Sequence, residues 1–279
     1  MNILARILLS CWAASAACQL QAEPADTRAE SSVTDEAVSP WRIGAALGYG
    51  ERSNPLIQSE PIPVVVDVDI AWFGKRWFFD NGDLGFTLRD NSKGTLNLVA
   101  RLNSDRVFFG RTNTRFVSVS LDGSQLPEPT PLRVPDRDYA AELGFEWLTD
   151  GRWGRLTVAA FRDVSRTHDG FSVDAEFAYA WYRARWTVEP TIMLRYKSAA
   201  LNDYYWGVRA AEASSALPVY QVGSGLNWQL GARASYYLSR HLRVAASINY
   251  ERLSDAAAGS PLVRDPEVTA FFAGLAYQF

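Results

Sequence analysis

The chain of 279 residues has a formal net charge of −3 at pH 7, and hydrophobic residues make up 48% of it. A weakly acidic chain offers no electrostatic footprint for DNA or RNA, so we expect no nucleic-acid partner. Nowhere does the sequence contain an apolar run of roughly 18 residues, which excludes membrane-spanning helices.

The N-terminus has the pattern of a secretory signal peptide. Arg6 precedes an apolar run from Ile7 to Ala17 that is too short for a spanning helix, and small residues favour cleavage after Ala22. We therefore predict a signal peptide over residues 1–22, with cleavage after Ala17 as the alternative. Both cysteines, Cys11 and Cys18, fall in this segment, so we expect no disulfide in the exported protein.

Residues 23–39 are acidic, rich in Ser and Ala, and free of aromatic side chains. Such a segment buries too little apolar surface to become ordered, so we predict a flexible periplasmic tail. The remaining residues, 40–279, are expected to form a single domain.

From Trp41 onward, segments about ten residues long alternate apolar and polar side chains. In the segment from Leu226 to Tyr236, for example, every second residue is apolar or aromatic, and Leu242 to Tyr250 repeats the pattern. This period of two is typical of β-strands with one apolar face. A soluble β-sandwich has the same period, with that face buried against a second sheet. The sequence therefore predicts an all-β fold, either a membrane barrel or a sandwich.

The connections favour the barrel. Tight turns at Thr149 to Arg152 and Ser239 to His241 are flanked by aromatic residues, whereas residues 104–137, 199–225 and 254–265 form long polar connections. Short periplasmic turns, long extracellular loops and interfacial aromatic residues are typical of antiparallel transmembrane β-barrels. Both termini then lie in the periplasm, which requires an even strand number. Ambiguous patterns between Arg76 and Ser120, including residues 115–120, allow ten or twelve strands, and we predict twelve.

The C-terminal strand carries a second membrane signal. Phe271, Ala273, Leu275, Tyr277 and Phe279 share one face, which is apolar to the last residue. A soluble protein seldom ends on an exposed apolar strand, because such an edge promotes aggregation. A barrel needs this strand to face lipid and pair with the first strand. Tyr277 and Phe279 are predicted to form the signal for the barrel-assembly machinery, which places the protein in the lipid of a Gram-negative outer membrane.

Charged residues of both signs lie on the polar faces of the predicted strands and should point into the lumen: Glu142, Glu146, Arg155, Asp174, Glu176, Glu189, Arg195, Arg233, Arg243 and Glu251. Mixed charges in a confined space favour ion pairs. Two interpretations follow, a narrow polar channel for small solutes or a set of side chains that satisfy one another and fill the lumen.

Candidates for chemistry are few. Ser165 and His168 lie close together in the segment Asp163 to Gly170, which permits the hypothesis of a membrane-embedded hydrolase. The Asp-Gly pair that ends this segment instead favours a polar surface turn. Phosphate-binding loops, cysteine-based metal sites and calcium loops are absent from the sequence. We therefore expect no catalytic residue, cofactor or metal, and no enzymatic activity.

Several stretches of the sequence resemble the MipA/OmpV (MltA-interacting protein) family of outer-membrane proteins. They are the strand beginning at Trp41, Asp163 to Gly170 (DVSRTHDG), Asp203 to Val208 (DYYWGV), Glu251 to Val263 (ERLSDAAAGSPLV) and the final Ala273 to Phe279. The resemblance covers nearly the whole exported chain, but no match extends over residues 104–137.

The resemblance implies a barrel that acts as a scaffold for peptidoglycan assembly and brings a lytic transglycosylase together with a murein synthase. Other members of the family look like general outer-membrane proteins. The resemblance implies no catalytic residues in this chain. Tyr204, Tyr205 and Trp206, in the DYYWGV stretch, are predicted either to form a binding platform at the barrel mouth or to pack its rim.

Overall fold

The computed structural model describes residues 40–109 and 134–279. The predicted signal peptide, the predicted periplasmic tail and the ambiguous segment 115–120 lie outside the described residues. Thirteen strands form one sheet in which every pair is antiparallel.

The first five strands are β1 (Trp41–Arg52), β2 (Ile62–Phe73), β3 (Trp77–Asp80), β4 (Asp83–Asn91) and β5 (Gly94–Leu102). The next five are β6 (Ala141–Gly151), β7 (Gly154–Asp163), β8 (Phe171–Ala178), β9 (Trp181–Arg183) and β10 (Trp186–Lys197). The last three are β11 (Gly225–Tyr237), β12 (Leu242–Arg252) and β13 (Glu267–Gln278). Three short helices accompany them in the part of the chain that the structure describes: η1 (Ser104–Phe109), α2 (Ala199–Trp206) and α3 (Asp255–Ala258).

Strands β8 and β9 are two sections of one crossing. Strand β10 pairs with β8 through Thr191–Lys197 and with β9 through Trp186–Val188. Pro190 lies between the two sections and has no N–H to donate, so the ladder is interrupted there. The thirteen strands therefore make a closed barrel of twelve crossings, and the predicted strand number is confirmed.

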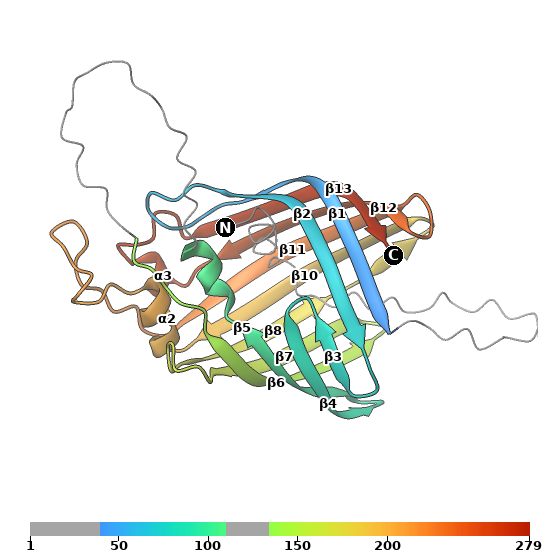
Figure 1. Cartoon of the computed structure of the whole chain (residues 1–279), viewed down its shortest axis with the longest axis horizontal. Helices are drawn as coiled ribbons and strands as arrows, with labels where there is room; N and C mark the ends of the chain where they lie inside the picture. The colour runs from blue at the N-terminus through green and yellow to red at the C-terminus, as the bar shows by residue number, and fades with distance from the viewer. Residues whose placement is uncertain (1–39, 110–133) are drawn as a thin grey trace, which may run out of the picture.

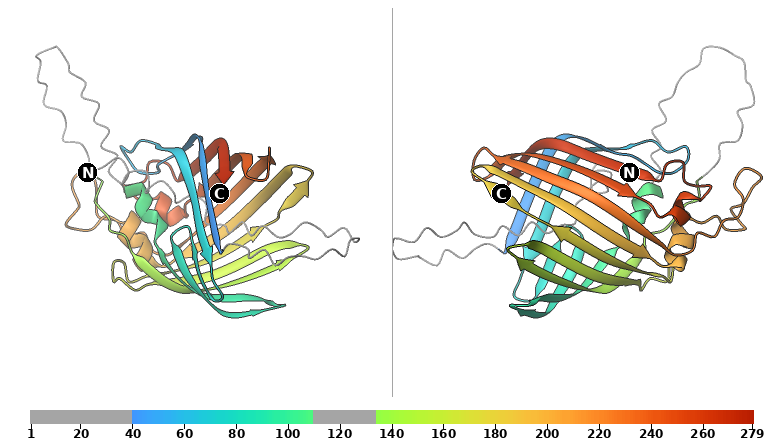
Figure 2. Two further views of the ribbon diagram at one scale, coloured as in Figure 1. Left: turned by 45° about the vertical axis from the view of Figure 1, so that its right-hand side comes forward. Right: turned by 180° about the vertical axis from the view of Figure 1, so that it is seen from behind.

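The barrel closes where β13 pairs with β1, from Gly44 opposite Gln278 to Arg52 opposite Ala270 (Figure 1). At this seam Leu47 and Leu275 lie opposite each other and are 66% and 52% exposed, so the apolar stripes of both strands face outward. Figure 2 shows from behind how steeply the strands from β10 to β13 are inclined. Large apolar side chains are exposed around the whole outer wall, as a barrel in lipid requires.

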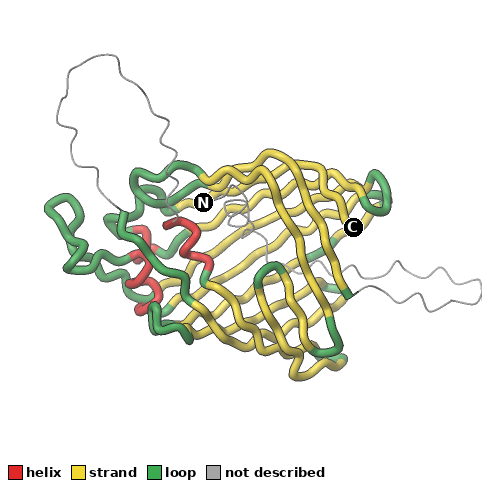
Figure 3. Tube along the Cα trace, in the orientation of Figure 1, coloured by secondary structure: helices red, strands yellow, loops and turns green. Residues whose placement is uncertain are grey.

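The two ends of the barrel differ. The helices gather at the end with the long connections, and the C-terminus lies at the opposite end with the short turns (Figure 3). Short turns are periplasmic in outer-membrane barrels, so the helices lie on the extracellular side. Of the helices that the structure describes, none has the length and apolar character needed to cross a membrane.

Gly48 and Gly274 allow the closing strands to approach each other. A Cβ atom at Gly48 would lie 2.6 Å from the Gly274 Cα atom and would also collide with the Ala273 carbonyl. A Gly48→Val substitution should cost about 1–3 kcal/mol through overpacking at the seam. We expect a smaller folded fraction, measured as the heat-modifiable band on unboiled SDS gels. Ala45→Val, on the outward face of the same strand, is the control, and equal folding of both variants would contradict this account of the seam.

Candidate functional site

The inner wall is organised by a guanidinium group from β5. The Arg101 side chain donates from Nε to Glu142 at 2.9 Å, from Nη1 to Asp174 at 3.1 Å and from Nη2 to Ser172 at 3.2 Å. Its Cζ atom also lies 3.5 Å from the centre of the Phe161 ring. One cation thereby links β6, β7 and β8, and both carboxylates find a partner inside the barrel.

A second guanidinium completes this network. Arg195 from β10 binds both oxygens of Asp174, with distances of 2.8 Å from Nε and 3.1 Å from Nη2. Asp174 is therefore shared by two arginines. Charged groups removed from water are tolerated when they are paired and hydrogen-bonded in this way.

The other residues predicted to face the lumen form smaller pairs. Glu146 accepts from Asn97 at 3.1 Å, Glu251 accepts from Asn227 at 3.0 Å, and Glu189 forms an ion pair with Arg233. Arg155 pairs with Asp150 beside a periplasmic turn, at 2.8 Å. A cavity of about 280 Å³ remains between these groups, and its lining includes Glu176, Arg195, Arg233, Arg243 and Glu251.

The helices form a packed cap at the extracellular end of the barrel. Trp206 and Tyr205 of α2 are completely buried in a hydrophobic cluster that contains Phe108 and Phe109 of η1 and Leu201. The Trp206 ring lies 5.8 Å from Phe108 and 5.7 Å from Phe109, between ring centres. Trp206, Phe108 and Phe109 thus pack against one another inside the cap. Of the three residues predicted to form a platform or pack the rim, Tyr205 and Trp206 lie in this core, whereas Tyr204 is half-buried and lines a second pocket.

A buried ion pair ties the cap to the barrel wall. Lys197, the last residue of β10, donates to both oxygens of Asp105 in η1, at 2.7 and 2.8 Å. The side chains are only 3% and 6% exposed. Sequence reasoning missed this pair, although Lys197 ends an alternating strand on its polar face.

A second buried cation holds the loop after α2. Arg137, whose side chain is fully buried, donates to Glu212 at 2.7 and 3.0 Å and to the Gly207 carbonyl at 3.0 Å. Burial acts to raise the pKa of the Glu212 carboxyl, but the hydrogen bonds from Arg137 outweigh it and lower that pKa below its ordinary value. Burial, followed by the nearby Asp105 charge, raises the pKa of the Tyr205 phenol, which donates to the Asp138 carbonyl at 3.1 Å.

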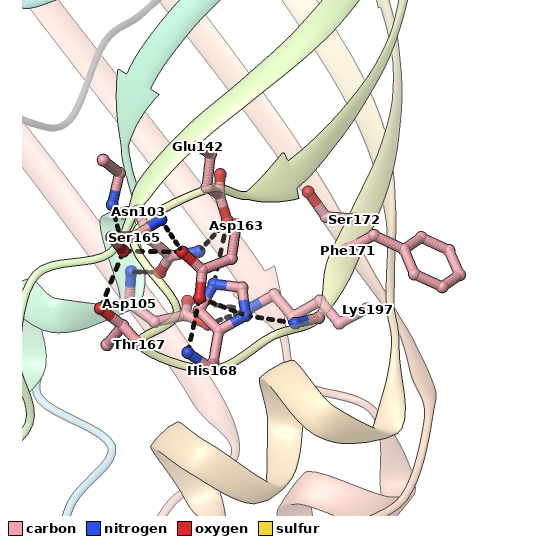
Figure 4. A network of polar contacts seen from close by, with 12 residues as sticks. Asn103, Asp105, Glu142, Asp163, Ser165, Thr167, His168, Phe171, Ser172 and Lys197 are labelled. Carbon is pink, nitrogen blue, oxygen red and sulfur yellow. Dashed lines mark hydrogen bonds and ion pairs between the residues drawn. The ribbon is translucent and has the colours of Figure 1, made fainter.

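The segment that allowed a hydrolase hypothesis is a hydrogen-bonded turn (Figure 4). The Asp163 carboxylate accepts from the Ser165 hydroxyl at 2.6 Å and from the backbone N–H of His168 and Asp169, at 2.6 and 2.9 Å. The His168 ring accepts from Gly170 N–H at Nδ1, and its Nε2 lies 3.4 Å from Glu142. Ser165 therefore has Asp163, not His168, as its partner, and the nucleophile and base that a hydrolase needs are not brought together.

The residues that the structure describes contain no cluster of three side chains suited to hold a metal ion. The arrangement that they do contain is a wall of paired charges beneath a packed cap. Such an arrangement can hold the barrel rigid and restrict passage along its axis.

The family model described as "MltA-interacting protein MipA" matches residues 43–279. The chain belongs to this family. The chain is similar to the MltA-interacting protein of Escherichia coli (strain K12), with 28% identity over 252 residues that cover 90% of this chain and 95% of that protein. The outer membrane protein OmpV of Vibrio cholerae serotype O1 is 29% identical over 214 residues, covering 76% and 77% of the two chains.

Among solved structures, an outer membrane channel from Pseudomonas putida F1 aligns with a TM-score of 0.36 and 9% identity, covering 90% of this chain and all of that chain. The barrel fold and the family together make this protein an outer-membrane β-barrel of a Gram-negative bacterium, as the sequence predicted.

The Lys197–Asp105 pair can be tested by Asp105→Asn, which leaves a buried ammonium without its charge partner. Breaking a buried pair in this way costs about 3–5 kcal/mol. We expect faster amide hydrogen exchange in η1 and α2, with the barrel strands unchanged. Asp169→Asn, an exposed position of the same cap, is the control. Unchanged exchange in η1 and α2 would show that Asp105 does not hold the cap.

The lowered pKa of Glu212 gives the cap a pH dependence. Its stabilising effect is complete above the unfolded carboxyl value of about 4.3 and is lost as the pH falls through the lower folded value. Glu212→Gln should loosen the cap by about 1–3 kcal/mol at pH 7, because Arg137 loses its partner.

Amide exchange of the Arg137 region measures this effect. The difference between Glu212→Gln and the wild type should shrink progressively as the pH is lowered below the ordinary carboxyl pKa of about 4.3. Glu267→Gln, which breaks an exposed pair with Arg252, should change little over the same range. A difference that stays constant throughout the acid range would exclude titration of Glu212 as the cause.

Proposed function

We propose that this protein is a non-catalytic outer-membrane scaffold that docks a lytic transglycosylase on its periplasmic end. A relative named MltA-interacting protein, aligned over most of both chains, supports the choice of partner. The paired charges of the lumen and the packed cap support a structural role over an open pore. The murein synthase that the family resemblance implies as a second partner stays a prediction.

The observation that carries the proposal is a ring of exposed basic side chains at the short-turn end, which we call the basic rim. Each periplasmic turn contributes to it, and its members are Lys75, Arg76, Arg89, Lys93, Arg152, Arg183, Arg185 and Arg240. Exposed acidic residues near these turns are few. Asp90 accepts from Thr95, and Asp150 is paired with Arg155. Among residues 40–109 and 134–279, the short-turn end therefore carries an excess of positive charge.

A ring of like charges on a rigid wall produces a field that extends into the solvent for about 8–10 Å at physiological salt. Such a field attracts a partner with an acidic surface, raises the rate of encounter and orients the partner. The turns are held by short hairpins, so the basic rim is largely formed before a partner arrives. This lowers the entropic cost of docking.

Charge reversal at the basic rim tests the docking proposal. Arg183→Glu, Arg185→Glu and Arg240→Glu in one variant should reduce capture of the lytic transglycosylase from detergent extracts by about tenfold or more. Capture by the wild type should weaken as salt increases. The matched control reverses Arg162, Arg166 and Arg264, which are exposed at the extracellular end. Failure of the wild type to retain the enzyme, or equal capture by both variants, would contradict the proposal.

The alternative of a small-solute pore makes the opposite prediction for conductance. A capped lumen crossed by ion pairs should give no steady current in a planar bilayer containing the purified wild-type protein. Asp105→Asn should give at most brief openings, because it loosens the cap without removing it. A steady, ohmic current from the wild type would favour the pore and remove the structural argument for a scaffold.

A further inference from the structure

The basic rim surrounds the place where the described chain begins. The carbonyl of Pro40, which directly precedes β1, accepts from the Phe73 N–H at 2.8 Å. Phe73 ends β2, and the exposed side chains of Lys75 and Arg76 follow it in the first periplasmic turn. The chain that precedes Pro40 is therefore attached beside two cations of the basic rim.

Another cation of the basic rim lies on the opposite side of β1. Gln278 of β13 is in register with Gly44 of β1, and its N–H donates to the His241 carbonyl at 2.8 Å. Exposed Arg240 directly precedes His241 in the turn between β11 and β12. The C-terminus lies at this same end of the barrel (Figure 3). Basic turns thus flank the attachment point at Pro40 on both sides.

The cations of the basic rim are available to a partner. Lys75, Lys93 and Arg240 are exposed and form no ion pair with any residue in 40–109 and 134–279. Like charges in a ring repel one another, so an acidic partner that neutralises them is favoured. A second copy of this chain presents a rim of the same sign and is therefore an unfavourable occupant.

The segment that precedes Pro40 in the sequence has the opposite charge. Residues 23–39 contain five carboxylates and a single basic side chain, Arg28. The carboxylates are those of Glu23, Asp26, Glu30, Asp35 and Glu36. An acidic segment is therefore joined covalently to the end of the barrel that carries the basic rim.

The length of the segment permits contact around the whole rim. A barrel of twelve crossings is roughly 25 Å across, from the spacing and tilt of its strands. Residues 23–39 can extend at most about 60 Å. Each exposed ion pair is weak, but attachment by a short linker raises the effective concentration to about the millimolar range. Several weak pairs formed within one chain then suffice for docking.

We propose that residues 23–39 dock on the basic rim of their own chain and compete there with an acidic partner. This inference rests on the proposed function, because it assigns a regulator to the surface on which the lytic transglycosylase docks. The contact within the chain exists without the partner, so it is measured separately.

Docking of the segment lowers the affinity of the basic rim for any acidic partner. A partner binds only those molecules in which the rim is free, so its apparent dissociation constant rises in inverse proportion to that fraction. Salt weakens both contacts, because both depend on exposed charges. The segment therefore acts as a competitor built into the chain.

A nitroxide label at Ser32→Cys tests the contact in the exported protein without any partner. No cysteine follows Cys18 in the sequence, so this is the only thiol once the predicted signal peptide is removed. In phosphatidylcholine vesicles, which carry no net charge, we expect a slowly tumbling label at about 0.02 M salt and a rapidly tumbling one at about 0.5 M. A label that tumbles rapidly at both salt concentrations would overturn the proposal.

Two charge variants of the labelled protein locate the contact. Lys75→Glu, Lys93→Glu and Arg240→Glu together should release the label at low salt, whereas reversal of Arg162, Arg166 and Arg264 at the extracellular end should not. In the segment, Asp26→Asn, Glu30→Gln, Asp35→Asn and Glu36→Gln together should also release it. Ser31→Ala with Thr34→Ala, which keep every charge, should not. A label that stays slow in the rim variant would place the contact elsewhere and contradict the proposal.

Capture of the lytic transglycosylase tests the competition. The variant with the neutralised segment should retain about three- to tenfold more enzyme than the wild type at low salt, and the two should converge as salt increases. Equal capture at low salt, together with a slow label in the wild type, would show docking without competition and refute that part. If neither protein retains the enzyme, the docking of the transglycosylase fails, while the label still decides whether the segment occupies the basic rim.

Discussion

Every backbone N–H and C=O group of a chain that crosses hydrocarbon must find a partner within the protein, and this constraint determines the structure. Most strands meet it by pairing with a neighbour on both sides, and β13 pairs with β1 along most of its length. Closure leaves an enclosed interior, so charged side chains on the inner faces must satisfy one another. The network around Arg101 and Asp174 is the result.

The alternation of side chains was sufficient to predict the class of fold, because a period of two with an apolar face persists from β1 to β13. The terminal strand was equally informative, since its apolar stripe continues to Phe279. The sequence is less informative about strand lengths and strand interruptions that depend on contacts with other strands. The turn at Asn81 and Gly82 that ends β3 has a local signal, but the sequence alone left the strand count in this region at ten or twelve. The interruption between β8 and β9 follows from Pro190 on a neighbouring strand.

The cap was the part of the site least accessible from sequence. Lys197 and Asp105 are 92 residues apart in the chain, and Arg137 and Glu212 are 75 apart. No periodicity connects such pairs, because long-range packing of loops brings them together. The DYYWGV stretch is recognisable in the sequence as a cluster of aromatic residues. Its burial depends on packing against η1, which is distant in the chain and which the sequence does not reveal. In the same way, Ser165 and His168 are neighbours in sequence whose side chains point to different partners.

The three surfaces of the molecule have different properties as a result. The extracellular end carries a packed hydrophobic cluster, the periplasmic end presents the basic rim, and the lateral wall exposes large apolar side chains. A closed end and a charged end are consistent with a protein that anchors a periplasmic partner to the membrane. Residues Ile62–Asp69 of β2 and the short strand β9 are each paired on one side alone among the described strands, so there the pairing constraint is left to groups outside the sheet.

Amide hydrogen exchange of the protein in detergent micelles, followed residue by residue, tests the pairing constraint most directly. The account predicts slow exchange along Gly44–Arg52 and Ala270–Gln278, equal to that of the central strands β10 and β11. It predicts fast exchange for the amides of Ile62–Asp69 that point away from β1. Exchange at the β1–β13 seam as fast as in the loops would contradict closure, and with it the enclosed, ion-paired interior.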